Sequence, residues 1–226
     1  MHVSSESQRP EDDRPPSPTN PRSGLWLEFV NTDAAAQAPR GDVFRDFDAL
    51  LQWLTTHGAL DEERAAGIRR RAMLQPAAAA ATVVDARRVR AALRVLAERG
   101  HSSARVCDDA VTEINRVLGR SAGTRRVDRQ DDGGYARAFV PTGDAFAGLM
   151  IPIVDSAADS LVNGELARVR RCADARCHRV FADTTKNGLR RWCDMGTCGN
   201  RAKAARHRAK LMTLPLRSRS TDQDRS

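Results

Sequence analysis

The chain has 226 residues, with 37 Lys and Arg against 29 Asp and Glu, which gives a formal net charge of +8. This length suits one sizeable core or two small domains. No run of about 18 apolar residues occurs, and the N-terminus lacks the apolar stretch of a signal peptide, so we expect neither a membrane span nor a secreted, disulfide-stapled domain. The five cysteines are an odd number, which favours free thiols or metal ligands over disulfides.

The positive charge is concentrated in one segment. Residues 168–217 hold 14 Lys and Arg and 3 acidic residues, a balance of +11, whereas the rest of the chain carries −3. This asymmetry indicates a polyanion-binding module attached to an ordinary globular domain. The alternative is a solvated Arg-rich surface. We expect a disordered leader at residues 1–22, which contain five of the ten prolines, and a disordered polar tail at residues 214–226.

The first predicted elements are an extended segment and two helices. Leu25–Thr32 is short, apolar and aromatic, which predicts a strand or an extended segment packed on the core. Residues 43–54 place apolar side chains at helical spacing after a candidate N-cap at Asp42. A further helix begins at an Asp61 cap and ends before Pro76.

A long helix is then predicted from Ala77 to Arg99, closed by Gly100. Asp108 or Asp109 is expected to cap the next helix, which Gly119 ends. Period-two character in RRVDRQ and YARAFV, separated by DDGG, predicts a β-hairpin at about 125–140. Helical spacing returns over residues 145–162, where Pro152 opens or kinks the helix and the Asn-Gly pair at 163–164 stops it.

Four cysteines form two close pairs. Cys172 and Cys177 are one C-x4-C pair, Cys193 and Cys198 are a second, and fifteen residues separate them. Zn²⁺ favours four soft ligands in a tetrahedron, and four thiolates leave no open position for a reactive water. We therefore predict one structural Zn²⁺ held by these four residues. Iron–sulfur ligation fits the following basic helix less well, and unligated or disulfide-bonded cysteines are the remaining alternative.

The surroundings of the pairs are predicted to support the metal. The fifteen residues between them are expected to form a short hairpin, with Phe181 and Trp192 as a small core. Because a Zn²⁺ ion with four thiolates has a formal charge of −2, neighbouring arginines are expected to neutralise it. These arginines are Arg171, Arg176 and Arg201. Cys107 stands apart and is interpreted as a small buried hydrophobic side chain, with a redox role as the alternative.

The sequence GNRAKAARHRAKLM after Cys198 predicts a helix because of its alanine content. We expect one stripe of this helix to pack on the zinc lobe and the opposite side to be cationic. The packed stripe is Ala202, Ala205, Ala209 and Met212, and the opposite side is Lys203, Arg206, His207 and Lys210. Cations at this spacing can follow phosphates or reach into a groove. The predicted nucleic-acid contacts are Arg190, Arg191, Arg201, Lys203, Arg206, Arg208 and Lys210, with a solvated face as the alternative.

These residues carry a resemblance. The pattern C-x4-C, F-x-D and R-R-W-C-x-M-x-x-C-G-N-R-x-K, which ends on Cys198-Gly199-Asn200-Arg201, resembles the CGNR zinc finger. The upstream region, with LEFVNT near its start, is similar to the ABATE domain that accompanies such fingers in bacteria. Together the two resemblances cover nearly all of residues 24–211. The resemblance implies a cytoplasmic, stress-related transcription regulator whose zinc ligands are Cys172, Cys177, Cys193 and Cys198 and whose finger binds DNA.

The expected fold is mainly α with a small β-hairpin, in the α+β class. A helical ABATE-like domain at residues 23–165 is followed by a treble-clef-like, four-cysteine zinc finger at residues 166–213. Within the finger, Asn200 is expected to cap the last helix. Arg201 is expected to bridge to Asp183, or else to contact phosphate from the helix N-terminus.

The leading functional hypothesis is a zinc-dependent regulator that binds double-stranded DNA, while the N-terminal domain senses a small-molecule effector or forms a homodimer. The alternatives are a zinc-stabilised protein–protein interaction module and a thiol sensor whose oxidation releases zinc. We do not expect an enzyme, because the five histidines are scattered and no phosphate-binding glycine loop or G-x-S-x-G motif occurs. Asp131 and Asp132 precede two glycines and are interpreted as part of a turn.

Overall fold

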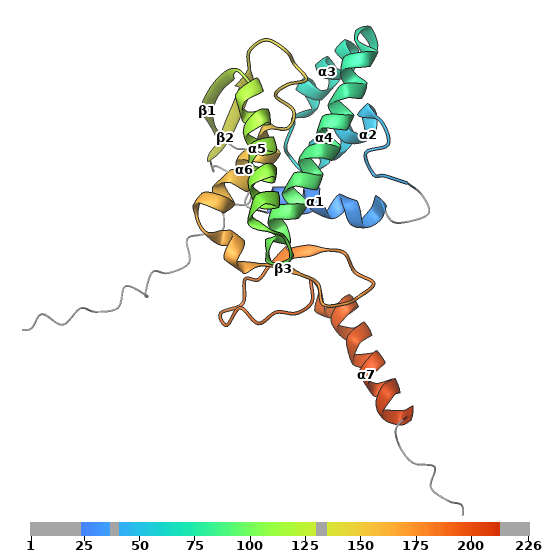
Figure 1. Ribbon diagram of the computed structural model, residues 1–226. Coiled ribbons are helices and arrows are strands. Elements are labelled where there is room, and N and C mark those ends of the chain that lie inside the picture. Colours follow the sequence, from blue (N-terminus) through green and yellow to red (C-terminus); the bar gives the residue numbers. More distant parts are fainter. Residues whose placement is uncertain (1–23, 37–40, 130–134, 213–226) are drawn as a thin grey trace, which may run out of the picture.

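The computed structural model describes residues 24–36, 41–129 and 135–212 (Figure 1). The predicted leader and tail therefore lie outside the described residues. The helices and strands are α1 (Leu25–Ala36), α2 (Phe47–Thr56), α3 (Glu62–Leu74), α4 (Pro76–Ala97), α5 (Ala104–Arg120), β1 (Gly123–Arg129), β2 (Tyr135–Pro141), α6 (Ile151–Val162), β3 (Val169–Arg171), β4 (Val180–Ala182) and α7 (Asn200–Met212). The predicted class, mainly α with a small β-hairpin, is confirmed, and the described residues form two such hairpins.

Helices α1 to α6 form a helical domain around one apolar core. The long helices α4 and α5 pack side by side, and α1 packs against both α4 and α6 (Figure 1). Trp26, Phe29, Phe44 and Leu54 are among the fully buried side chains. None of the helices in the described part of the chain has the length and hydropathy of a membrane span.

The prediction of an extended segment at Leu25–Thr32 is wrong, because these residues belong to helix α1. Trp26, Phe29 and Val30 follow one another at helical spacing, and all three are buried. A short apolar run has the same composition whether it forms a buried strand or a buried helix. Here the spacing of three and four residues places the large side chains on one face, and that face packs on the core.

Two predicted N-caps are also wrong. Helix α2 is capped by Asp46, whose carboxylate accepts from the Ala49 amide at 2.8 Å, whereas Asp42 pairs with Arg90. Helix α5 starts earlier than expected, at a Ser103 cap, so Asp108 and Asp109 lie inside it. It also continues to Arg120, one residue past Gly119.

Other boundaries are confirmed. Asp61 caps α3, which ends before Pro76, and α4 then runs from Pro76 to Ala97, close to its predicted range. Strands β1 and β2 pair antiparallel from Gly123–Pro141 to Arg129–Tyr135, although the DDGG turn lies outside the described residues. Pro152 stands in the first turn of α6 and opens it. Gly164 follows with a φ of 71°, a left-handed conformation that suits a helix stop.

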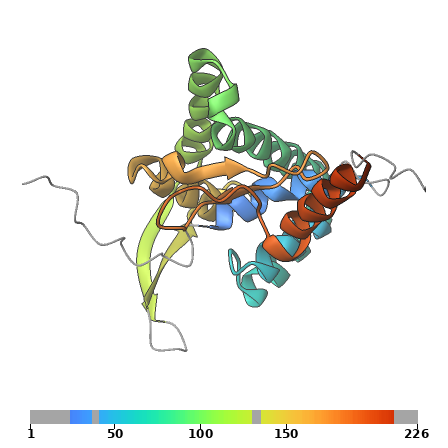
Figure 2. The ribbon, with the colours of Figure 1, turned by 90° about the horizontal axis from the view of Figure 1, so that it is seen from below.

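The C-terminal lobe, residues 168–212, lies beneath the helical domain in Figure 1. Its two strands, β3 and β4, pair antiparallel from Val169–Ala182 to Arg171–Val180. Helix α7 leaves the lobe and points away from the helical domain (Figure 1), and the view from below has α7 in the foreground (Figure 2). The lobe therefore carries α7 into solvent.

Candidate metal centre

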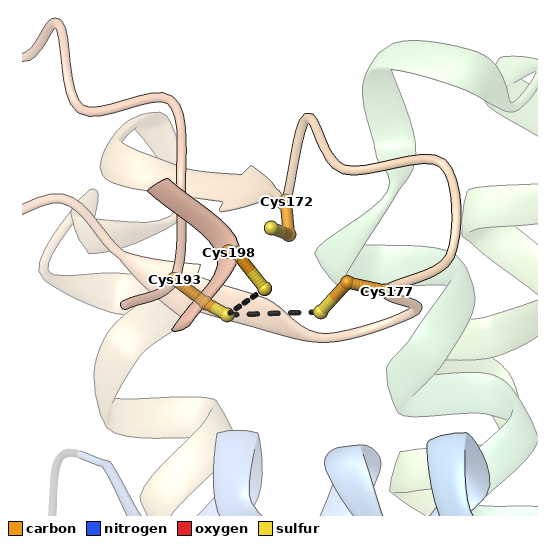
Figure 3. A group of neighbouring side chains, drawn as sticks. All are labelled: Cys172, Cys177, Cys193 and Cys198. Carbon is orange, nitrogen blue, oxygen red and sulfur yellow. Dashed lines mark hydrogen bonds between the residues drawn. The ribbon is translucent and has the colours of Figure 1, made fainter. Parts of the chain in front are cut away.

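The four paired cysteines meet at one point of the C-terminal lobe (Figure 3). The Sγ atoms of Cys172, Cys177, Cys193 and Cys198 all lie within 4.8 Å of one another. Cys177 Sγ is 3.7 Å from Cys193 Sγ, which is 3.8 Å from Cys198 Sγ. A disulfide requires about 2.05 Å between the sulfurs, so these residues are free thiols brought together without a covalent bond.

This geometry fits one structural zinc ion. In a tetrahedron with Zn–S distances of about 2.3 Å, neighbouring sulfurs are about 3.8 Å apart. The two Sγ–Sγ distances of 3.7 and 3.8 Å agree with that value. Because thiolates fill all four positions, such an ion has no site for substrate or an activated water. The metal would therefore stabilise the lobe and would supply no reaction chemistry.

The thiols perturb one another as expected for a cation-binding cluster. Burial and hydrogen bonds with the thiols of Cys177 and Cys198 raise the pKa of Cys193. Burial opposes ionisation of Cys172 as well, but the backbone amides of Cys193 and Asp174 hydrogen-bond to it and lower its pKa. Burial therefore opposes ionisation of both thiols. A divalent metal ion would stabilise the four thiolates.

The first cysteine pair lies in the loop between β3 and β4. The Cys172 amide donates to the Arg179 carbonyl at 2.9 Å, and the Cys177 amide donates to the Asp174 carbonyl at 2.8 Å. The prediction that a hairpin separates the two pairs is therefore wrong. The strands instead flank the first pair, because the partner of β4 is β3, which precedes Cys172.

The second pair is held by a tight turn at Met195–Gly199. Asp194 caps this turn, accepting from the amide and hydroxyl of Thr197 at 2.7 and 2.8 Å. A Cβ at Gly199 would come within 3.0 Å of the Met195 side chain, so a larger residue after Cys198 would require that side chain to shift. The prediction that Asn200 caps the last helix is wrong, because the side-chain nitrogen of Asn200 donates to the Gly196 carbonyl inside the turn.

A small core joins the two pairs. The buried side chains Cys172, Phe181 and Cys198 pack together with Trp192, as the sequence predicts. Arg190, predicted to contact nucleic acid, lies over the Phe181 ring at 4.9 Å and donates to the carbonyls of Trp192 and Cys193. The structure therefore gives Arg190 a role in holding the lobe together.

Arg201 forms a bridge, but to a different acid from the one predicted. Its guanidinium is 2.9 Å from Asp174, which follows the first cysteine. The expected partner, Asp183, is 1% exposed and accepts from Thr185 and from the Arg190 amide. Arg201 thus ties α7 to the loop of the first cysteine pair.

The other two arginines expected to neutralise the metal also face acids. Arg176 is 4.0 Å from Asp174, and Arg171 is 3.9 Å from Glu98 of the helical domain. Reasoning from the sequence missed the structural acids Asp174 and Asp194, and it gave Asp183 the wrong partner. For Asp194, the signal was available, because Asp three residues before Thr197 is a common capping pattern.

Helix α7 differs from its prediction in one respect. Ala205, Ala209 and Met212 are exposed, so the alanine stripe does not pack on the lobe. The predicted cations Lys203, Arg206, Arg208 and Lys210 are exposed as expected. Among the described residues, Lys203, Arg206 and Arg208 have no ion pair with an acid. Arg191 is exposed too, with its guanidinium 5.3 Å from the Trp192 ring centroid.

The fold and the site define a class of protein in which a helical domain precedes a zinc-finger lobe with four cysteine ligands. Residues 168–210 match the CGNR zinc finger family. Residues 23–164 match the ABATE family, described as a putative stress-induced transcription regulator. That match spans more than half of the chain, so the chain belongs to the ABATE family. A search of curated proteins finds no match. Neither matched family is an enzyme family, and together they support a zinc-binding regulatory protein.

Proposed function

We propose that this protein is a zinc-dependent transcription regulator that binds double-stranded DNA through α7. In this proposal Cys172, Cys177, Cys193 and Cys198 hold one Zn²⁺ that shapes the lobe. The observation that carries the proposal is the charge of α7, which contains five Lys and Arg and no acidic residue over Asn200–Met212. An exposed helix with this charge suits a polyanion better than it suits bulk solvent.

The geometry of α7 supports duplex DNA in particular. Thirteen residues make a helix about 20 Å long, and the major groove admits a single α-helix. Lys203, Arg206 and Lys210 are three and four residues apart, so they share one face. That face can contact phosphates along one groove edge, which fixes orientation without reading sequence.

The proposed contact set is smaller than the set predicted from sequence. It comprises Arg191, Lys203, Arg206, Arg208 and Lys210. Arg190 and Arg201 are assigned instead to positioning, because their guanidinium groups bind the lobe itself. Their contribution to DNA affinity would be indirect, through the placement of α7.

The helical domain would provide regulation. A groove of about 590 Å³ lies among α2, α3 and α4. It is lined by apolar side chains such as Phe47 and Met73 and by charged residues of both signs, namely Arg45, Arg69, Arg87, Asp46 and Asp48. We propose this groove as the place to seek a small-molecule effector. Homodimerisation of the helical domain is the alternative route to regulation.

The test is a salt titration of DNA binding by the zinc-loaded full chain, measured by fluorescence anisotropy on a mixed-sequence duplex. Each phosphate contact should contribute about −0.9 to the slope of log K against log salt. Replacing Lys203, Arg206, Arg208 and Lys210 by Ala should flatten that slope and weaken binding. The matched control replaces four exposed arginines of the helical domain, Arg70, Arg71, Arg88 and Arg105, by Ala.

The control removes the same charge from a different surface, so it separates a specific interface from general attraction. Equal weakening in both variants would show that net charge alone attracts DNA. A flat salt response of the unmodified protein would favour the protein–protein interaction module. Zinc release by peroxide without any DNA binding would favour the thiol sensor.

A further inference from the structure

Asn31 of α1 pairs with strand β4 of the C-terminal lobe. Its side-chain oxygen accepts from the Val180 amide at 2.8 Å, and its side-chain nitrogen donates to the Val180 carbonyl at 2.9 Å. The amide of one side chain thus satisfies both backbone groups of Val180, as a neighbouring strand would. Both residues are buried, and Val180 packs in the core of the helical domain.

Arg94 of α4 makes a second, partly buried connection next to the first. Its guanidinium donates to the His178 carbonyl at 2.7 Å and to the Val30 carbonyl at 3.0 Å. Only 15% of its side chain is exposed. On the surface, Arg179 pairs with Glu28 at 3.2 Å. Residues 178–180, which directly follow Cys177, are therefore held by α1 and α4.

The second cysteine pair has a different environment. Within the described residues, the hydrogen bonds and ion pairs of residues 190–201 stay inside the C-terminal lobe. They include the Ala173 amide with the Arg191 carbonyl at 2.8 Å and Arg201 with Asp174 at 2.9 Å. One half of the metal centre thus belongs to a hairpin fixed on the helical domain. The other half belongs to the segment that carries α7.

We propose that Asn31 and Arg94 are positioning residues of the metal centre. They hold the loop of Cys172 and Cys177 in its binding conformation, and Zn²⁺ then ties Cys193, Cys198 and α7 to this fixed half. A site that is half ordered beforehand loses less conformational entropy on binding, so its affinity is higher. The inference rests on zinc binding at the four cysteines and is independent of DNA binding.

The coupling between the helical domain and zinc binding must act in both directions. If the helical domain strengthens zinc binding, bound zinc must stabilise the helical domain by the same coupling free energy. Zinc should therefore raise the melting temperature of the whole chain, as any ligand of the native state does. Loss of the Asn31 connection should reduce that rise, because the two parts are then less coupled.

The experiment uses the full chain and two readouts, the zinc dissociation constant from competition with a chromophoric chelator and the zinc-induced rise in melting temperature. Asn31→Ala leaves the amide and carbonyl of Val180 buried without partners. We expect its zinc dissociation constant to rise about tenfold and its zinc-induced thermal shift to shrink. Arg94→Met keeps the aliphatic stem and should act in the same direction with a smaller effect.

The matched control is Ile68→Ala in α3, a buried position of the helical domain whose helix packs on α2 and α4. This change should lower the melting temperature of the metal-free chain but leave the zinc dissociation constant and the thermal shift unchanged. Unaltered zinc affinity in the Asn31 and Arg94 variants, or equal weakening in the control, would overturn the proposal. If Asn31→Ala does not fold, Arg94→Met and the control decide the question. DNA is absent from both readouts, so a failure of DNA binding leaves this test intact.

Discussion

Helices α4 and α7 use arginine in opposite ways. The Arg90 side chain in α4 is 5% exposed, binds both oxygens of Asp42 at 2.8 and 2.5 Å, and also contacts Asp33 at 3.1 Å. Its guanidinium is 5.0 Å from the Phe44 ring centroid. In α7, Arg206 and Arg208 are exposed and have no acidic partner among the described residues.

The difference shows why the net charge of a segment does not by itself identify a binding surface. A buried arginine loses its hydration and needs carboxylates and carbonyls to compensate, so its charge is already neutralised within the fold. An exposed arginine without an acidic partner keeps its field available to a polyanion. We therefore expect the charges of α4 to stabilise the fold and those of α7 to act on a partner.

The largest effect is expected when the metal centre is broken. Cys198→Ser removes one of four thiolates, so zinc affinity should fall on the order of 100-fold or more, and under the proposed function DNA binding should be lost with it. Most of the far-UV circular dichroism of the helical domain should persist, because nearly all of its core side chains come from α1 to α6 and the segments between them. Cys107→Ser, outside the cluster in α5, is the control and should retain one zinc per chain in metal analysis. Equal zinc content in the two variants would contradict the assignment.

The next largest effect concerns the α4 network. Asp42→Asn should lower the free energy of unfolding by about 3 kcal/mol, because it leaves Arg90 buried with a weaker partner. The hydrogen bond from Arg90 lowers the pKa of Asp42, against an opposing effect of desolvation. The ion pair therefore stabilises the fold fully above about pH 4 and less as pH falls through the folded pKa.

Urea unfolding followed by circular dichroism at several pH values measures both effects. The unmodified chain should lose more stability between about pH 5 and pH 3 than the Asp42→Asn variant does. Zinc affinity at neutral pH should stay within about twofold, because Asp42 makes no contact with the lobe in the described structure. Parallel pH profiles would show that this ion pair does not govern acid stability.

Arg201 is the intermediate case, an arginine of α7 that has an acidic partner. Arg201→Ala should weaken zinc binding about fivefold, or about 1 kcal/mol, since it leaves Asp174 almost buried without its closest cation. Arg176→Ala removes a more exposed and more distant cation from the same carboxylate and should change the affinity little. Chelator competition on both variants compares them directly. The same loss in both would mean that general charge, and not the bridge, matters.

The smallest effect on stability is expected for the exposed cations of α7. Replacing Arg206 and Arg208 by Ala should change the free energy of unfolding by less than about 0.5 kcal/mol, because neither side chain is buried or, in the described structure, paired with an acid. The same variant should bind DNA more weakly if the proposed function holds. Urea unfolding and anisotropy on one protein preparation measure the two quantities. A clear loss of stability would show that these residues support the lobe.

The metal cluster could be predicted from sequence because it depends on local spacing. Each C-x4-C pair lies in one short loop, so four ligands and the small core of Phe181 and Trp192 followed from residue types alone. The pairing of β3 with β4 could not be derived in the same way. Strand β3 precedes Cys172, and three-residue strands carry too little periodicity to be recognised.

Non-local contacts explain the other errors. Asp is a common residue type at helix N-caps, which suggested that role for Asp42. However, Arg90, 48 residues later, binds Asp42 more strongly than a helix terminus would. The alanine stripe of α7 suggested packing, yet amphipathic spacing does not supply the surface on which a helix packs. Nothing in the sequence indicated the role of Asn31, because the partner of a polar residue at the end of an apolar run is visible only in three dimensions.

The turn that carries Cys198 has a consequence for α7 itself. A solvated helix of about 13 residues is marginal in water, because its first turn must fix several residues for a single hydrogen bond. Here the cap at Asp194 and the turn Met195–Gly199 lead directly into α7, so the metal-bound lobe would supply that nucleus ready made. Zinc would then set the helix–coil equilibrium of α7. The cationic side chains of α7 would lie together on one face only while the metal is bound.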